Sequence, residues 1–105
     1  MNKPKESDWR TFRNSLEKWR ERYLTCKNDE IRSILKDSKR DETEKFWGIV
    51  DFQKREAKIL RECLDGYSRS KMFLHMATMK RHGMIGEEDL KEFSQELREG
   101  LDIFD

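Results

Sequence analysis

Residues 41–67 read DETEKFWGIVDFQKREAKILRECLDGY, and their apolar side chains repeat at the spacing of an α-helix. The two apolar rows are Phe46, Val50, Ala57, Leu60, Leu64 and Tyr67, interrupted by Gln53, and Ile49, Phe52, Ile59 and Cys63. Asp41 and Glu44 have the spacing of a capping box, so we expect the helix to begin there. Because two rows make this helix apolar over more than one face, we expect residues 46–67 to form the long central helix of a bundle.

A second apolar pattern precedes this stretch, with alternating spacings of three and four residues. It consists of Trp9, Phe12, Leu16, Trp19 and Tyr23. This spacing is that of a heptad seam, and Ser7 is expected to cap the helix that carries it. Asn28 is a good N-cap for a short second helix over residues 29–37, and residues 38–40 are the expected connecting loop. Residues 1–6 are expected to form a flexible tail.

The chain after residue 66 has further helical segments. Gly66 either ends the preceding helix or bends it, since residues 67–82 return to helical spacing. Gly83 is expected just past the end of that segment, with the two apolar residues after it completing the cap. A last helix is expected over residues 87–99. Three apolar residues near the C-terminus are expected to dock on the bundle, namely Leu101, Ile103 and Phe104.

Length and composition agree with an all-α fold. A chain of 105 residues favours one domain, here residues 7–105. Leu, Ile, Val and Phe make up only 22 residues, but 11 aromatic and five Met residues supply a core, and the net charge is only +1. One Val and four Thr leave little for a sheet, which excludes a parallel α/β enzyme and a β-sandwich. We therefore expect a small bundle of four to five helices.

Apolar runs and cysteines indicate the compartment. No run approaches 18 apolar residues and the first residues lack the apolar stretch of a secretory signal, so we expect neither a membrane span nor secretion. Cys26 and Cys63 are 37 residues apart without a Cys-x-x-Cys pair, which favours buried, reduced thiols. We expect a cytoplasmic protein.

Charge is unevenly distributed along the chain. Residues 67–83 carry four basic and no acidic side chains, whereas residues 84–105 carry two basic and eight acidic ones. The two segments are expected to neutralise each other, within one chain or across a dimer. The alternative is that one of them faces a charged partner. Glu88, Glu92 and Glu96 form an acidic ladder on the expected last helix, either solvated or paired with nearby cations.

A Met-rich face in the basic segment is the predicted partner-binding site. Met72, His75, Met76 and Met79 fall on one helical face. Thioether and imidazole groups suit copper(I), but no Cys or carboxylate is near in sequence, so we expect no metal and no cofactor. A flexible Met stripe is typical of a core, or of an adaptable protein-binding groove. The predicted partner-binding residues are Arg69, Lys71, Met72, His75, Met76, Met79, Lys80 and Arg81.

Motifs for catalysis are missing from the sequence. It has no Gly-rich phosphate loop, no Glu-x-x-His pair and no His-x-x-x-His pair. We therefore expect no enzymatic activity. The favoured function is that of a small cytoplasmic regulatory or adaptor protein, which binds another protein and forms a homodimer through the heptad seam of the first helix.

Nucleic-acid binding is the alternative function. Four basic residues in the first helix, Arg10, Arg13, Arg20 and Arg22, flank the aromatic residues of the seam. They could contact phosphates while exposed rings stack on bases. Against this, seam residues are normally buried, and a pI near 7.8 is below that of typical nucleic-acid-binding domains.

Overall fold

The protein is all-α over residues 3–103, the part of the chain that the computed structural model describes. Its elements are α1 (Glu6–Lys36), α2 (Glu42–Leu64), α3 (Met72–Arg81), α4 (Glu87–Leu90) and α5 (Gln95–Ile103). The expected small helical bundle is confirmed. None of these described helices has a stretch long and apolar enough to cross a membrane.

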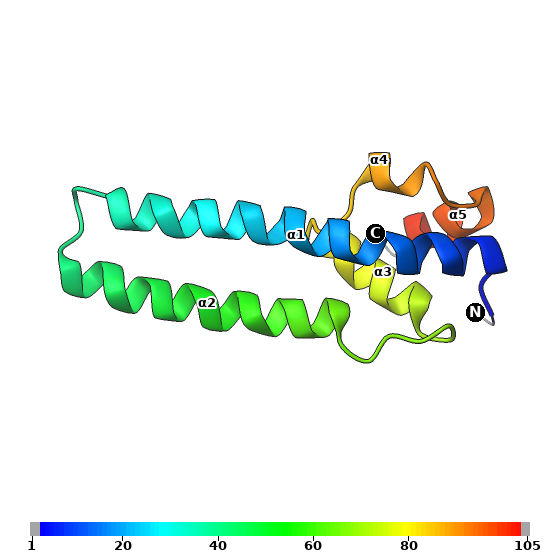
Figure 1. Ribbon diagram of the computed structural model, residues 1–105, viewed down its shortest axis with the longest axis horizontal. Helices are drawn as coiled ribbons and strands as arrows, with labels where there is room; N and C mark the ends of the chain where they lie inside the picture. The colour runs from blue at the N-terminus through cyan, green and yellow to red at the C-terminus, as the bar shows by residue number, and fades with distance from the viewer. Residues whose placement is uncertain (1–2, 104–105) are drawn as a thin grey trace.

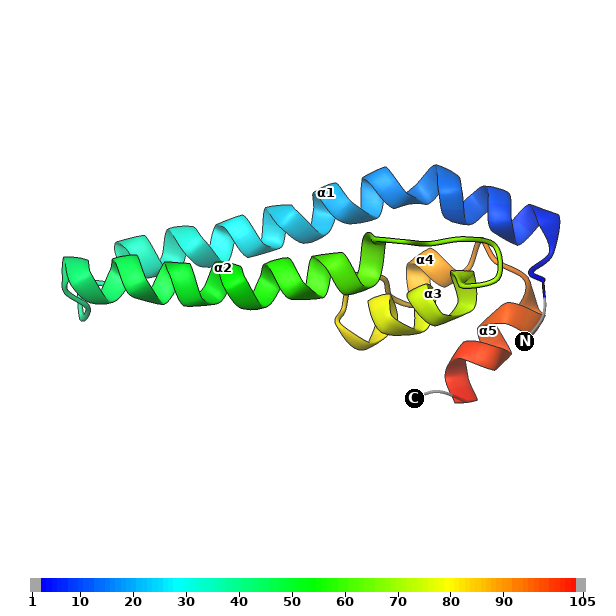
Figure 2. The ribbon, with the colours of Figure 1, turned by 90° about the horizontal axis from the view of Figure 1, so that it is seen from below.

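The molecule has two ends of different construction. It measures 51 × 24 × 24 Å, and α1 and α2 form an antiparallel hairpin at one end, while α3, α4 and α5 gather along the first half of α1 at the other (Figures 1 and 2). We call residues 24–60 the hairpin end. The rest of the described chain is the bundle end.

The hydrophobic core lies in the bundle end. Its buried apolar residues are Trp9, Phe12, Trp19, Tyr23, Cys63, Met72, Met76, Met79, Met84, Ile85, Leu90, Phe93, Leu97 and Leu101. The heptad seam of α1 is therefore buried within one chain, where Phe12 packs edge-on against Tyr67 and Trp19 packs against Phe93. The expected contact between two copies through this seam is wrong, because the same chain already covers it.

The role expected for residues 46–67 also differs. Of α2 only Cys63 is fully buried, and the side chains of Phe46 and Trp47 are 60% and 58% exposed. Two apolar rows require two layers of neighbours to cover them. Over the hairpin end α2 has α1 alone, so the centre of the core falls on α1 and α3 instead (Figure 1).

The first helix is continuous for 31 residues, so the expected break at Asn28 is wrong. Asn28 is exposed in mid-helix, and Lys27 and Glu30 form an ion pair of 3.0 Å across the expected break. A cap contributes only about 1 kcal/mol. The uninterrupted backbone hydrogen bonds and the packing of the helix on α2 outweigh it.

The start of α1 differs from expectation as well. Lys5 is the N-cap residue and makes no side-chain cap, while the carbonyl of Ser7 accepts a hydrogen bond from Thr11. Glu6, expected in the tail, belongs to the helix. Residues 1–2 lie outside the described residues.

Local signals around α2 and α3 were predicted correctly. The capping box of Asp41 and Glu44 is present, after the expected loop. Gly66, at φ +69°, follows the end of α2, so the chain breaks there rather than bends. Gly83, at φ +75°, follows α3, and the amide of Met84 donates to the carbonyl of Met79 at 2.8 Å, completing a Schellman cap.

The expected last helix is split into α4 and α5. A buried carboxylate from the start of α1 holds the break: Asp8 accepts hydrogen bonds from the backbone amide and the hydroxyl of Ser94, at 2.9 and 2.6 Å. The Ser94 hydroxyl in turn accepts from the amide of Leu97 in the first turn of α5.

The split changes two expectations near the C-terminus. Glu88 lies in α4 and Glu96 in α5, with Glu92 between the helices, so the acidic ladder is wrong. Leu101 docks in the core as expected, but Ile103 is 83% exposed. Phe104 lies outside the described residues.

Candidate protein-binding groove

The predicted Met-rich surface lies inside the molecule. Met72, Met76 and Met79 are fully buried and His75 is 9% exposed, so their prediction as a partner-binding surface is wrong. The His75 ring donates from Nδ1 to the carbonyl oxygen of Cys63 at 2.8 Å. α3 packs against α2 and α5, and its Met row belongs to the same core as the seam of α1.

The charged members of the predicted site lie around this core. Arg69 pairs with Glu6 through both guanidinium nitrogens and lies over the ring of Trp9, 5.4 Å from its centroid. Lys80 contacts Asp102 at 3.2 Å, while Lys71 and Arg81 are exposed. The expected neutralisation of residues 67–83 by residues 84–105 is therefore confirmed for Lys80, whereas Arg69 pairs with α1.

A bidentate ion pair joins α1 to α4. Arg22 donates to both carboxylate oxygens of Asp89 at 2.9 and 2.8 Å, and to the carbonyl of Met84. Burial alone raises the pKa of Asp89, but the hydrogen bonds from Arg22 and from the amide of Gly86 outweigh it, so the pKa lies below its usual value. Arg22 therefore connects α1 to α4 within the bundle end, and its guanidinium is engaged in these contacts.

The burial of the seam removes the stacking mechanism of the nucleic-acid alternative. Trp9, Phe12 and Trp19 are at most 8% exposed, so their rings cannot stack on bases. Arg20 pairs with the neighbouring Glu21. The basic side chains of α1 are therefore the only part of the nucleic-acid hypothesis that stays at the described surface, without exposed rings on which bases could stack.

The hairpin end carries an open apolar groove, lined by α1 and α2 alone. Its larger part, near the tip, has a volume of about 510 Å³, and its smaller part, toward the bundle end, about 210 Å³. Gln53 lines both, so the two hollows adjoin along α2, and together they are called the hairpin groove. The apolar lining residues are Leu24, Ile31 and Leu35 from α1, and Phe46, Ile49, Val50, Phe52, Ala57 and Leu60 from α2.

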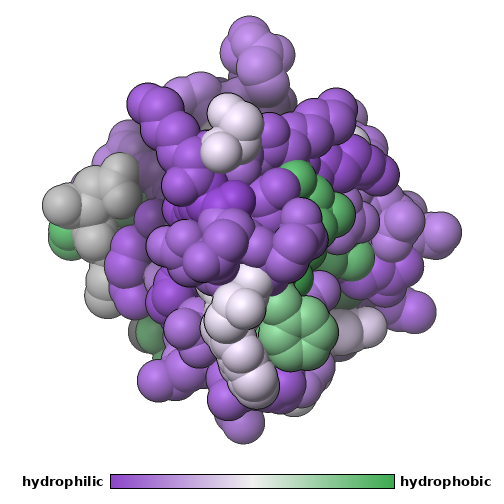
Figure 3. Space-filling view, turned by 90° about the vertical axis from the view of Figure 1, so that its left-hand side faces the viewer, coloured by the Kyte–Doolittle hydropathy of each residue, from purple (hydrophilic) through white to green (hydrophobic). Residues whose placement is uncertain are grey.

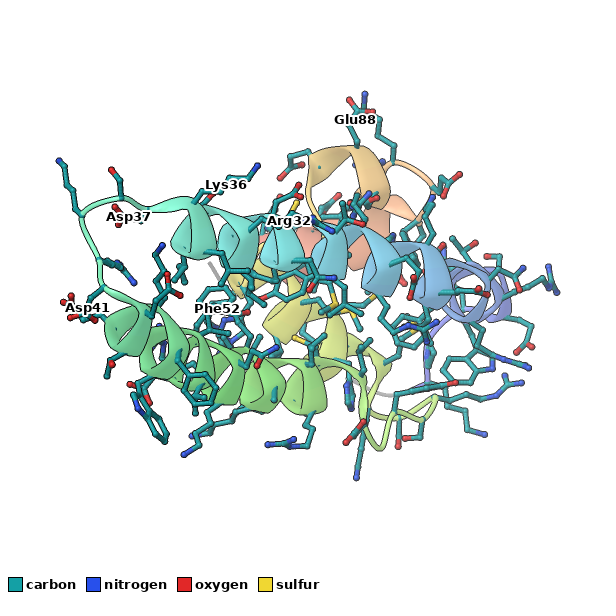
Figure 4. All side chains as sticks on the ribbon, turned by 60° about the vertical axis from the view of Figure 1, so that its left-hand side comes forward. Arg32, Lys36, Asp37, Asp41, Phe52 and Glu88 are labelled. Atoms are coloured by element: carbon teal, nitrogen blue, oxygen red, sulfur yellow. The ribbon has the colours of Figure 1, made fainter. Side chains whose placement is uncertain are left out.

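The two apolar rows of α2 explain how the groove arises. Phe52, from the row of Ile49, projects from α2 into the space between the two helices (Figure 4). The row that begins with Phe46 lies beside this contact, and it is only partly covered. Leu60, at the bundle side of that row, packs against the core, whereas Phe46 at the tip is 60% exposed.

Two exposed aromatic side chains lie near the tip of the hairpin: Phe46 lines the groove, and Trp47 packs against Phe46. The rings of Phe46 and Trp47 pack edge-on, with centroids 5.0 Å apart, and Leu35 on α1 is 53% exposed. In the view along the hairpin from its tip, the surface is mainly hydrophilic, and a few hydrophobic patches are exposed on it (Figure 3). These large side chains are held on a rigid two-helix scaffold without burial.

Polar groups lie at the bundle side of the groove. The hydroxyl of Tyr23 donates to Glu56 at 2.5 Å, and Lys27 lies over the Tyr23 ring, 5.0 Å from its centroid. Burial first, and the hydrogen bond to Glu56 second, raise the pKa of Tyr23. The phenol is therefore neutral at physiological pH. This cluster closes the groove where the bundle end begins.

Another hollow at the hairpin tip is more polar. It measures about 490 Å³ and is lined largely by charged and small side chains, namely Glu30, Ser33, Ile34, Arg40, Gly48, Asp51, Phe52 and Arg55. Arg40 leans on Gly48, where an added Cβ would lie 3.2 Å from the guanidinium. The apolar groove is therefore the better candidate for binding protein.

The cysteines and acidic groups give no second candidate site. Burial raises the pKa of the Cys63 thiol to about 11, which makes it a poor nucleophile. Cys26 is exposed, contrary to expectation, and both cysteines are free. Within residues 3–103 no three His, Cys, Asp or Glu side chains gather in a way that could hold a metal ion.

Comparisons with known protein families, with curated proteins and with solved structures find no match for this chain. The groove therefore has to be interpreted from its own chemistry. Sequence analysis found both apolar rows of α2 but not that one of them stays open. The adjacent Phe46 and Trp47, which point to different faces of one helix, were the available signal.

Proposed function

We propose that this protein is a small, non-catalytic adaptor or regulatory protein that binds another protein through the hairpin groove. The observation that carries the proposal is the exposure of Leu35 and Phe46 in one apolar groove, with the exposed Trp47 packed against Phe46. Exposed apolar side chains that gather on a rigid scaffold are typical of interaction sites. We further propose a cytoplasmic location, supported by the two free cysteines.

The shape of the groove favours an amphipathic helix as the bound element. Grooves between two helices accept the apolar face of a third, with anchors at helical spacing. Trp is among the residues that contribute most to binding energy at interfaces, and the exposed Trp47 packs against the groove residue Phe46. The hairpin is already ordered, so binding costs little conformational entropy of the scaffold.

The test compares two variants that change similarly exposed apolar residues. Phe46→Glu places a charge at the groove, whereas Leu74→Glu changes a residue of α3 that is 58% exposed and does not line the groove. Proteins captured by the wild-type chain in cells are purified and their direct binding measured by calorimetry. Binding that is lost with Phe46→Glu and kept with Leu74→Glu supports the proposal. Binding that ignores Phe46→Glu contradicts it.

A further inference from the structure

We propose that a second copy of this chain occupies the groove, with the two hairpins packed face to face and antiparallel as a four-helix bundle. The inference rests on the proposed function, since it names the partner of the same groove. Four features support it: the symmetry of the apolar rows, the position of the polar residues, the charge along α2 and the placement of the bundle end.

The apolar rows that line the groove read nearly the same in both directions. On α2, Phe46 and Leu60 lie seven residues either side of Gln53, with Val50 and Ala57 at the intermediate positions. A two-fold axis through Gln53 therefore places Phe46 of one copy beside Leu60 of the other. Such a self-complementary surface is what a two-fold contact requires.

The apolar row of α1 that lines the groove also reads nearly the same in both directions, and it lies beside the row of α2. It consists of Leu24, Asn28, Ile31 and Leu35, whose spacings of four, three and four are unchanged by reversal. Its one polar member, Asn28, lines the same part of the groove as Gln53. Both polar residues therefore lie near the proposed axis, where they can hydrogen-bond between copies. A polar residue within an apolar seam commonly fixes the register of helix pairs.

Charge along α2 reverses from one end of the groove to the other. Residues 41–48 carry Asp41, Glu42, Glu44 and one Lys, whereas residues 54–61 carry four basic side chains and one acidic. At the register set by Gln53, residues 41–48 of one copy lie beside residues 58–65 of the other, which carry two basic and two acidic side chains, so antiparallel pairing keeps the two acidic tips apart. Parallel pairing would instead place like charges at the same level.

The bundle end favours the same arrangement. α3, α4 and α5 all lie at the end of the molecule away from the hairpin tip (Figures 1 and 2). Antiparallel overlap of the hairpins keeps the two bundle ends apart, beyond the tips of the partner. Parallel overlap would place them side by side, where each occupies space that the other requires.

The size of the contact is that of a weak, transient interface. Residues 42–60 span about 28 Å of helix, and two adjacent helices present a face about 20 Å wide. Such a face covers roughly 550 Å² per copy, or roughly 1,100 Å² in all, near the lower end of specific interfaces. We therefore expect a dimer with a dissociation constant on the order of micromolar.

The first experiment measures mass by sedimentation equilibrium from about 1 to 200 µM. The wild-type chain is expected to pass from 12.8 kDa to twice that mass. Phe46→Glu should raise the dissociation constant at least tenfold, and Leu74→Glu should leave it unchanged. Leu35→Glu, at a residue 53% exposed, is the second groove variant, and circular dichroism verifies the fold of each.

The second experiment determines the orientation by cross-linking in a Cys26→Ser background. Gln53→Cys should form a disulfide-linked dimer on mild oxidation, because the two thiols meet near the axis. Phe46→Cys is the matched control: its two copies should lie about 21 Å apart along the helices and stay unlinked. Efficient linkage through Phe46→Cys without linkage through Gln53→Cys would overturn the antiparallel arrangement.

A constant mass of 12.8 kDa over the whole range of protein concentrations would overturn the inference. A dimer whose dissociation constant does not change with Phe46→Glu would overturn it as well. The two proposals fail separately. A monomer that still binds another protein in a Phe46-dependent way overturns the self-association alone. A dimer that depends on Phe46, in a chain whose binding to other proteins does not change with Phe46→Glu, overturns the proposed function alone.

Discussion

The two ends of this molecule carry similar apolar side chains and bury them differently. At the hairpin end, residues 46–52 contain Phe, Trp, Ile, Val and Phe within seven positions, yet none of these side chains is fully buried. At the bundle end, residues 72–79 contain three Met, each fully buried. The number of helices that reach a face, and not the density of its apolar residues, determines burial.

The two ends are therefore expected to have different roles, stability at the bundle end and binding at the hairpin end. The bundle end is held by ring contacts, by the Asp8–Ser94 hydrogen bonds and by the Arg22–Asp89 ion pair, so most of the stability lies there. The hairpin end is a two-helix extension whose open face is free for binding. Substitutions in the two ends should therefore differ in the property that they affect.

The largest effect is expected from a matched pair of phenylalanines. Phe12→Ala removes a ring that is 0% exposed and should lower the free energy of unfolding by about 3–5 kcal/mol. Phe46→Ala, at a ring 60% exposed, should lower it by less than about 0.5 kcal/mol. Urea denaturation followed by circular dichroism at low protein concentration measures both. Equal losses would show that the two ends are equally packed.

The next effect concerns the buried carboxylate of Asp8. Asp8→Ala leaves the amide and hydroxyl of Ser94 without their acceptor and should cost about 1–3 kcal/mol. The amides of α5 should then exchange hydrogen faster than those of α2. Asp29→Ala, at an exposed residue in an ion pair with Arg32, is the control and should cost less than about 0.5 kcal/mol. Equal costs would contradict a clamp at Asp8.

A smaller, pH-dependent effect is expected at the Arg22–Asp89 pair. The pKa of Asp89 is lowered in the folded protein, so the stability that it contributes is present above its usual value of 3.8 and is lost as the pH falls through the folded pKa. Arg22→Met should cost about 1 kcal/mol at pH 7, after allowance for the partly exposed guanidinium.

The same variant should respond less to acid than the wild type does. Arg22→Met removes the strongest of the interactions that lower the pKa of Asp89, so less stability remains to be lost between pH 5 and pH 2. Thermal unfolding at a series of pH values measures this slope. Arg20→Met, which removes an exposed ion pair with Glu21, should leave the slope unchanged. A parallel decline in wild type and Arg22→Met would refute the role of the pair.

The smallest effect has an informative sign. If α1 is continuous, Asn28→Ala replaces a poor helix former in mid-helix and should stabilise the protein by about 0.5 kcal/mol. If Asn28 capped a separate helix, the same change would destabilise by about 1 kcal/mol. Denaturation in a Phe46→Glu background, where association through the groove is removed, gives the sign.

Much of the local structure could be predicted because its causes are local. The capping box at Asp41 and the glycine cap at Gly83 each involve residues within a few positions of each other. The helical spacing that places Trp19 and the rest of the seam on one face of α1 is local as well. In these cases the sequence neighbours are also the structural neighbours.

The sequence predictions that were wrong concern features that depend on contacts between residues far apart in the chain. The break between α4 and α5 depends on Asp8, which is 86 residues away from Ser94 in sequence. The Met row of α3 became core because α2 and α5 pack against α3 beside the seam of α1, and a Met row has the same pattern in a core and in a groove. The continuity of α1 through Asn28 likewise depends on packing against α2.

The candidate groove shows the same limit most clearly. The sequence by itself determined that α2 carries two apolar rows, because helical periodicity is a property of the chain. Only the tertiary structure decided which row is covered. Residues 67–103 fold back on the first half of α1 and not on the hairpin, since the ring contacts of Tyr67 and Phe93 and the carboxylate of Asp8 attach them there. The row of Phe46 is therefore left without a third helix.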